Sequence, residues 1–329
     1  MTRLDADSAV AAESPVACEG PRALLLEMRE VPLGGVRGME VHRALPQRDL
    51  PLVGAWCFLD RFGPQDTLMR VEPHPHIGLQ TVTWPLVGEV RHRDSLGSDV
   101  LVQRGALNIM TSGVGIAHSE YSVGDGPAPL DALQLWVALP ESRRHGDPSF
   151  ERHDDLPIVT LPSDGGRPAE VAVVVGSFGD ATSPATMYTP IVGAEIFLPA
   201  GARVTVPLAP EWEYALAGVD GEVEVAASDE GMTTLDRSHL LYLGRGREEV
   251  VVTTADDEAT LFLLGGEPFD DEIVMWWNFV GRSHDEIVEA REAWESGSAR
   301  FGHVVGHGDE RIPAPPLPAV KLTRRRRRI

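Results

Sequence analysis

Cysteine is scarce in this chain of 329 residues, which contains only Cys18 and Cys57. Two cysteines cannot form a disulfide framework, and no CxxC pair exists, which fits a reducing cytoplasm. No apolar stretch approaches the length needed to span a bilayer. The first residues also lack the apolar run of a signal peptide. We therefore expect a cytoplasmic protein that does not enter a membrane.

Positive charge is also scarce, since 29 lysines and arginines face 50 aspartates and glutamates, for a net charge of −21. Such a field repels phosphate backbones, so direct nucleic-acid binding is disfavoured. The exception is the run from Arg324 to Arg328 near the C-terminus. We interpret this run as a solvated, flexible end rather than a functional patch.

What the chain does contain is typical of a β-rich globular protein. The 33 glycines and 26 prolines have no repeating period and indicate many short strands joined by turns. One series of β-type runs ends near Leu156 and includes Leu79–Pro85 and Leu133–Leu139. A second series extends from Val171 to Leu264, with turn residues at the spacing of a sandwich or small barrel. Periodicity alone does not prove a duplicated barrel.

The predicted organisation is therefore a two-domain all-β protein. We place the limits at 1–22 for a flexible N-terminus, 23–160 and 161–296 for the two domains, and 297–329 for an extended Pro/Arg-rich tail. One helix is predicted within the second range, because Ser283 and Glu286 form a capping box and Ile287, Ala290 and Trp294 follow at helical spacing until Gly297. The proline-rich run 312–318 predicts an extended segment laid across the other domain.

Two pairs of metal-ligating residues stand out in the first domain. His74 and His76 are two residues apart, as are His118 and Glu120. Residues two apart on a strand project from the same face, so two such pairs on facing strands can converge on one point. Three imidazoles and one carboxylate suit Fe, Mn, Co, Ni or Zn and leave positions open for water or substrate.

The alternative is that these histidines lie in surface loops, because a single HxH is a weak signal. Two pairs near Gly78, Gly113 and Gly115, which permit tight turns, favour the metal site. The other histidines stand alone or in polar segments, and we interpret each as a surface or hydrogen-bonded residue: His92, His145, His153, His239, His284, His303 and His307. No nucleophile elbow, P-loop or dinucleotide fingerprint occurs.

Several segments resemble the pirin family. They are HPHIGLQTVTW from His74, GEVRHRDSLG from Gly88, MTSGVGIAHSE from Met110, LQLWVALP from Leu133 and GEPFDDEIVMWWNFVGRSHDEI from Gly266. The likeness runs in the family's order from about Val36 to Trp294. It implies a bicupin, with two tandem cupin barrels, each a double-stranded β-helix or jelly roll, and a short C-terminal helix. Within the final motif, Trp276 and Trp277 are interpreted as packing between domains.

The resemblance also implies a cofactor and its ligands. One divalent metal, with Fe(II) as first choice and Mn, Co, Ni, Cu or Zn as alternatives, is expected on His74, His76, His118 and Glu120 of the N-terminal barrel. The C-terminal barrel is expected to be structural, because its strands contain no HxH.

In activity, several pirins resemble flavonol 2,4-dioxygenases (quercetinases), so a small aromatic substrate and O₂ are the expected reactants. Glu120 would be a ligand and also the base that accepts the substrate proton. The expected pocket residues are Ile77, Leu79, Gln80, Val114 and Ile116. The alternative for these positions is ordinary barrel core, which is favoured for at least two of them.

Ile77, Leu79, Gln80 and Val114 also depart from the family pattern, in which charged or aromatic residues are usual. Neighbouring groups set a metal's properties, so the substrate does not transfer directly. The alternative function is a non-enzymatic, iron-dependent regulator that binds a protein partner, and chain acidity suits a basic partner. A third hypothesis is a folded, metal-competent protein without turnover on flavonols.

Overall fold

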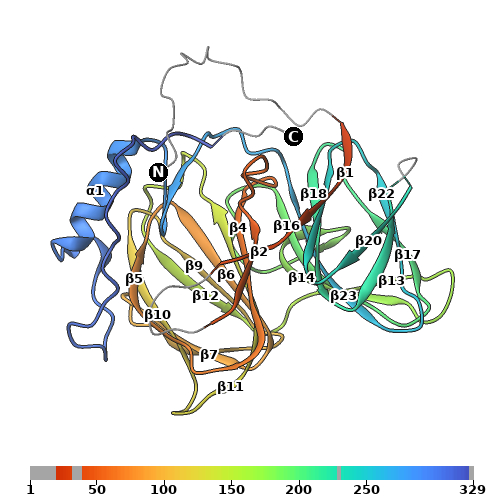
Figure 1. The fold of residues 1–329 in the computed structure, drawn as a ribbon, viewed down its shortest axis with the longest axis horizontal. Coiled ribbons are helices and arrows are strands. Elements are labelled where there is room, and N and C mark those ends of the chain that lie inside the picture. Colours follow the sequence, from red (N-terminus) through yellow and green to blue (C-terminus); the bar gives the residue numbers. More distant parts are fainter. Residues whose placement is uncertain (1–19, 32–38, 228–230, 326–329) are drawn as a thin grey trace, which may run out of the picture.

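The computed structural model describes residues 20–31, 39–227 and 231–325. Cys18 and the arginines at 326–328 lie outside this part. The described chain forms two β-barrels side by side, with one helix on the outer flank of the first barrel (Figure 1). The predicted all-β, two-barrel architecture is confirmed.

The first barrel consists of a large and a small sheet. The large sheet has the order β12 (Ser149–His153), β9 (Leu107–Thr111), β6 (Leu79–Val87), β11 (Ala128–Ala138), β4 (Trp56–Thr67), β3 (Val41–Leu45) and β2 (Arg29–Glu30). The small sheet has the order β5 (Arg70–His76), β10 (Ile116–Ser122), β7 (Glu89–Asp94) and β8 (Asp99–Gln103). In β7, exposed and buried residues alternate, as expected of a strand with one solvent-exposed face. By contrast, β6 is buried on both faces because the second barrel covers it.

The second barrel repeats this plan. Its large sheet has the order β1 (Pro21–Glu27), β21 (His239–Gly244), β18 (Glu213–Asp220), β23 (Ala259–Gly266), β16 (Ile191–Leu198), β14 (Ala169–Phe178) and β13 (Ile158–Leu161), with β15 (Ala181–Thr182) beside β14. Its small sheet has the order β17 (Arg203–Pro207), β22 (Glu249–Thr253), β19 (Glu222–Ala226) and β20 (Met232–Asp236). The apolar runs between Val171 and Leu264 thus form strands as predicted.

Both ends of the chain cross to the opposite barrel. β1 pairs antiparallel with β21 of the second barrel, although it precedes the whole first barrel in sequence. After β23 the chain returns to the first barrel as β24 (Val274–Trp276), β25 (Phe279–Gly281), α1 (His284–Glu295) and the short 3₁₀ helix η2 (Ala299–Phe301). The sequence-based domain limits stay a prediction, and they do not include this exchange.

The helix forms where the capping box predicts it. The Ser283 hydroxyl accepts a hydrogen bond from the Glu286 backbone N–H at 3.2 Å. The Glu286 carboxylate accepts a hydrogen bond from the backbone N–H of Arg282. Ile287, Ala290 and Trp294 are buried on the face that packs on the first barrel. The confirmed helix therefore serves as an anchor for the C-terminal segment.

The tail beyond η2 has no further helix or strand in the described residues and lies along the first barrel and α1. The Ile312 N–H donates to the carbonyl of Pro73 at 2.8 Å, and the Trp294 indole N–H donates to the carbonyl of Ile312, also at 2.8 Å. The predicted extended segment thus bridges α1 and the strand that carries His74 and His76.

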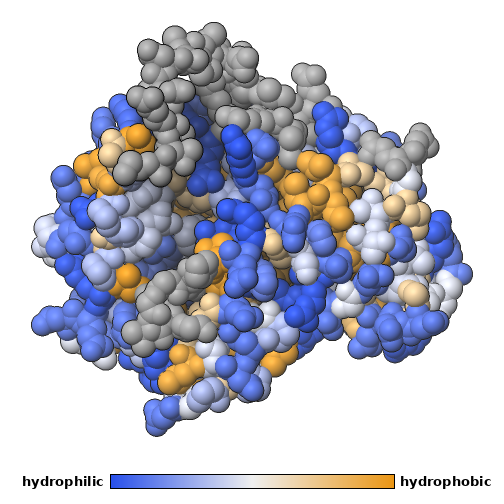
Figure 2. Space-filling view, viewed as in Figure 1, coloured by the Kyte–Doolittle hydropathy of each residue, from blue (hydrophilic) through white to orange (hydrophobic). Residues whose placement is uncertain are grey.

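The two large sheets face each other across a shared apolar core. The indole N–H of Trp56, from the first barrel, donates to the Val192 carbonyl of the second at 3.0 Å, and that of Trp84 donates to Glu195 at 2.7 Å. Hydrophilic side chains cover most of the face in Figure 2, with hydrophobic ones in separate groups. No helix in the described residues has the length and apolar character needed to cross a membrane.

Candidate metal centre

Three histidines converge inside the first barrel. His74 and His76 lie two apart on β5, and His118 on the adjacent antiparallel strand β10 is the register partner of His74. All three are buried, and their nitrogen ligand atoms lie within 4.8 Å of one another. The Nε2 atoms of His76 and His118 are 3.0 Å apart. Pairing of the two strands thus brings these side chains to one point.

Tight turns end both ligand strands. Gly78 follows β5 with φ of +69°, and a Cβ there would lie 2.0 Å from the Val280 carbonyl oxygen. Gly113 precedes β10 with φ of +47°, and its carbonyl accepts from the Gly78 N–H at 3.0 Å. Gly115 has no positive φ, but Arg300 and Phe301 pack against it so closely that a larger side chain would meet them. These glycines therefore fix the two strand ends together.

The outer nitrogen of each histidine has a hydrogen-bond partner. His74 Nδ1 lies 2.9 Å from the Glu72 carbonyl oxygen, and His76 Nδ1 lies 3.2 Å from that of Asn278 in the β24–β25 hairpin. A carbonyl only accepts, so each Nδ1 carries the proton and Nε2 keeps its lone pair. This is the tautomer that a metal ligand requires.

His118 is held by a longer chain of polar groups. His92 Nε2 lies 3.3 Å from the Asp94 carboxylate, and His92 Nδ1 lies 3.3 Å from His118 Nδ1. Asp94 accepts the proton of His92 Nε2, which leaves His92 Nδ1 to accept from His118. Burial raises the pKa of Asp94, but hydrogen bonds from His92 and Ser98 outweigh it and lower the pKa overall. An ionised carboxylate therefore orients His118 through His92.

Electrostatics keep the cluster neutral. Burial lowers the pKa of His76 and His118 well below the usual value, and the neighbouring His74 lowers it further. Neutral imidazoles with inward Nε2 lone pairs are the donors that Fe, Mn, Co, Ni, Cu and Zn accept. The residues present thus fit a divalent transition metal.

Glu120 lies close to this cluster but outside the group of three. A register shift in the β5–β10 pairing between His118 and Glu120 places Glu120 opposite Val71. Its carboxylate oxygen lies 3.5 Å from the Thr83 hydroxyl. Burial raises the pKa of Glu120, against the opposing effects of His92 and Thr83. Its role as a fourth ligand stays a prediction.

A cavity of about 450 Å³ opens onto the centre and is lined by both His74 and Glu120. Its walls are mostly apolar and aromatic, and Phe58 and Trp136 stack with ring centroids 4.0 Å apart. The size suits a small aromatic molecule. The other lining residues are Val31, Met39, Arg43, Pro46, Asp60, Phe62, Met69, Val71, Gln134, Met275, Trp276, Trp277, Asn278, Ile312 and Arg325.

The residues expected to form a pocket lie elsewhere. None of Ile77, Leu79, Gln80, Val114 and Ile116 lines this cavity. Ile77 and Leu79 are buried in apolar clusters, Ile116 is also buried, and the Gln80 amide donates to Thr111 and to the Thr186 carbonyl. The Val114 carbonyl accepts from Arg300. The burial of Ile77, Leu79 and Ile116 agrees with the barrel-core alternative for these three, whereas Val114 is half-buried in the turn that precedes β10.

His92 and His307 support the centre, although each stands apart from the ligand pairs in the sequence. His92 had a sequence signal, because Asp94 follows two residues later on the same strand face. His307 had none, since it lies 186 residues from Tyr121, which it contacts. Its Nε2 is 2.9 Å from the Ser119 hydroxyl, and its Nδ1 is 3.2 Å from the Glu72 carboxylate. The tail thus contacts both ligand strands from behind.

Replacing His307 by alanine is expected to weaken metal binding by about 10- to 100-fold, because Glu72 and Ser119 lose the group that holds β5 against β10. Competitive titration with a chromophoric chelator measures the change in affinity. His303→Ala is the matched control, because His303 belongs to the same tail but is exposed. Equal affinities for the two variants would contradict a supporting role for His307.

Two stacked β-barrels with a three-histidine centre in the first define a bicupin with a metal site of cupin type. Comparison with known protein families identifies the bicupin family to which the chain belongs. The Pirin family model matches residues 38–137, and the model of the Pirin C-terminal cupin domain matches residues 193–302. The chain belongs to the pirin family, as the sequence motifs predicted.

Several relatives cover nearly the whole chain. A Pseudomonas aeruginosa protein named "Putative quercetin 2,3-dioxygenase" is 40% identical over 88% of this chain and 89% of its own length. A pirin-like protein of Caulobacter vibrioides is 34% identical over 89% and 99%. The crystal structure of quercetin 2,3-dioxygenase from Acinetobacter baumannii is 38% identical, with a TM-score of 0.82 over 91% of this chain and 96% of that one.

Proposed function

We propose that this protein is a metal-dependent dioxygenase that acts on flavonols or similar flat aromatic compounds. The observation that carries the proposal is the cavity itself, in which aromatic walls lead to His74 and Glu120 beside the three-histidine cluster. The names of the relatives from Pseudomonas aeruginosa and Acinetobacter baumannii support the same reaction class.

His74, His76 and His118 would hold the metal through Nε2, with Glu120 as a fourth ligand and Fe(II) as the first candidate ion. When bound, the metal would supply Lewis-acid stabilisation of a deprotonated substrate oxygen and a site for reaction with O₂. The chain's own contribution is to keep the imidazoles neutral, oriented and inside an apolar space that excludes bulk water.

Glu120 is the proposed proton acceptor. Glu120 lines the same cavity as His74, so a substrate hydroxyl bound beside His74 would be available to its carboxylate. Burial raises the pKa of Glu120, which makes it a stronger base than an exposed carboxylate. The Thr83 hydroxyl lies 3.5 Å from a Glu120 oxygen and 3.0 Å from the Gln134 side-chain oxygen, and its single proton can be donated to either of them.

Anaerobic reconstitution tests the proposal. The full chain is loaded in separate samples with Fe(II), Mn, Co, Ni, Cu or Zn and then mixed with a flavonol in oxygenated buffer. We expect oxygen uptake, loss of flavonol absorbance and release of carbon monoxide with at least one metal. Absence of turnover with every metal and every flavonol would refute the dioxygenase assignment.

A further inference from the structure

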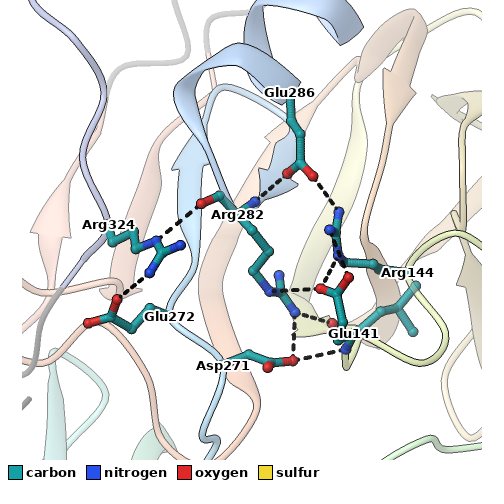
Figure 3. Close-up of polar contacts among 8 residues, drawn as sticks. Glu141, Arg144, Asp271, Glu272, Arg282, Glu286 and Arg324 are labelled. Carbon is teal, nitrogen blue, oxygen red and sulfur yellow. Dashed lines mark hydrogen bonds and ion pairs between the residues drawn. The ribbon is translucent and has the colours of Figure 1, made fainter.

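The start of the C-terminal arginine run is attached to the fold. Arg324 donates from Nη1 to the Glu272 carboxylate at 2.7 Å and from Nε to the Arg282 carbonyl at 3.2 Å (Figure 3). The backbone N–H of Arg325 donates to the carbonyl of Ile273 at 3.0 Å. The first two arginines are exposed, as the sequence indicates, but specific contacts hold them on the fold.

The anchor of this segment is a network of charged groups that joins the tail to the first barrel. Arg282 donates to the Leu139 carbonyl at 2.7 Å and to Asp271 at 3.0 Å. Glu286 of α1 accepts from Arg144 at 2.9 Å and from the backbone of Arg282 (Figure 3). Because the chain runs from Asp271 directly into β24, the tail and the Trp276–Asn278 wall of the cavity share one support.

These contacts bring Arg325 to the cavity that leads to His74 and Glu120. The other cavity arginine, Arg43, is committed to Asp60 through two hydrogen bonds of 2.7 Å. Within the described residues, the Arg325 side chain has neither a hydrogen bond nor an ion pair. The Arg325 side chain is exposed, yet desolvation by the surrounding protein lowers its pKa, and the cations Arg29 and Arg43 lower it further. Among the described residues, no carboxylate contacts this guanidinium, although Asp60 and Glu120 line the same cavity.

We propose that Arg325 binds an anionic group of the substrate. The cavity would then select flat aromatic compounds that carry a carboxylate, sulfonate or comparable anion in addition to the oxygen that binds the metal. A guanidinium forms strong, charge-assisted hydrogen bonds with such groups. The apolar and aromatic walls hold the ring system, and Arg325 holds the charge. This inference rests on the proposed function for the presence of an aromatic substrate.

Matched ligands test the selection. The probes are a flavonol and the same flavonol with one sulfonate on its B ring, which stays ionised at neutral pH. Binding to the full-length, metal-loaded protein is measured without oxygen by quenching of the tryptophan fluorescence, since Trp136, Trp276 and Trp277 line the cavity. We expect the wild type to bind the sulfonate about tenfold more tightly than the neutral flavonol.

Arg325→Gln should reduce this preference to about onefold, because the neutral amide provides no charge-assisted bond. Lys321→Gln is the control, since Lys321 is an exposed cation of the same tail and does not line the cavity. It should keep the wild-type ratio. Arg325→Lys should restore part of the preference.

An equal preference in wild type and Arg325→Gln would overturn the inference, as would the lack of any preference in the wild type or failure of both ligands to bind. The outcome is separate from that of the proposed function. Charge-selective binding without turnover in oxygen would sustain the role of Arg325 and contradict the dioxygenase. Turnover without charge-selective binding would support the dioxygenase and contradict the role of Arg325.

Discussion

Replacement of His118 by alanine is expected to lower the affinity for a divalent metal by more than about 100-fold, beyond the effect typical of groups that only orient a ligand. His118 supplies one of three converging nitrogens, and its Nε2 lies 3.0 Å from that of His76. The variant also leaves His92 Nδ1 without the donor that it has in the wild type. Metal content after reconstitution and dialysis, measured by mass spectrometry, gives the result.

The control for this variant is His239→Ala. His239 lies on β21 of the second barrel and bonds to Asp236 at 2.7 Å, far in sequence from the proposed ligands. It should retain the wild-type metal content. Thermal unfolding of both variants separates loss of metal from loss of fold. A folded His118→Ala protein with full metal occupancy would contradict the assignment of His118 as a ligand.

Glu120→Gln is expected to slow turnover by about 10²- to 10⁴-fold, the range lost when a general base is removed. The amide has nearly the same shape as the carboxylate and can still lie beside Thr83, but it cannot accept a substrate proton. Metal content and turnover are measured on the same sample, because a fourth ligand would change the first and a base would change the second.

The matched control is Glu222→Gln, an exposed position on β19 of the second barrel. Its turnover should equal that of the wild type. If Glu120→Gln retained turnover within about twofold of the wild type, Glu120 would not be the proton acceptor. If it lost both metal and turnover, coordination would be the main role of the carboxylate.

Local patterns explain how much of the fold the sequence predicts. Strands such as β16 and β23 are short, apolar and bounded by turn residues, so their own residues determine them. The helix is likewise specified by Ser283, Glu286 and the buried spacing of Ile287, Ala290 and Trp294. By contrast, β1 is recognisable only through its partner β21, more than two hundred residues later. The pairing of β1 with a strand of the other barrel leaves no recognisable pattern in the residues of β1 itself.

The candidate site likewise has a part that the sequence predicts, the ligand pairs, and a part that it does not predict, the cavity. The HxH and HxE pairs work as predictors because a strand places residues i and i+2 on one side, which holds for His74 and His76. The cavity depends on which distant segments meet. Its walls come from β4, from the β24–β25 hairpin and from the tail, and only folding brings these together. Neither Arg325 nor His307 could be assigned from spacing, because their partners belong to other segments.

The positions of the residues that depart from the family pattern show what these residues contact. Ile77, Leu79 and Gln80 fill the barrel and its support rather than the cavity. Ile77 also pairs with Phe279 of the hairpin whose Asn278 carbonyl holds His76. We infer that Ile77 affects the orientation of His76 through this hairpin.

The most direct test of the metal centre is an anomalous difference map from crystals of the protein purified from its own cell. We predict one strong peak bounded by Nε2 of His74, His76 and His118, with the Glu120 carboxylate facing it, and no comparable peak in the second barrel. A metal bound at other residues, or a first barrel that stays without metal after reconstitution with every candidate ion, would contradict the account.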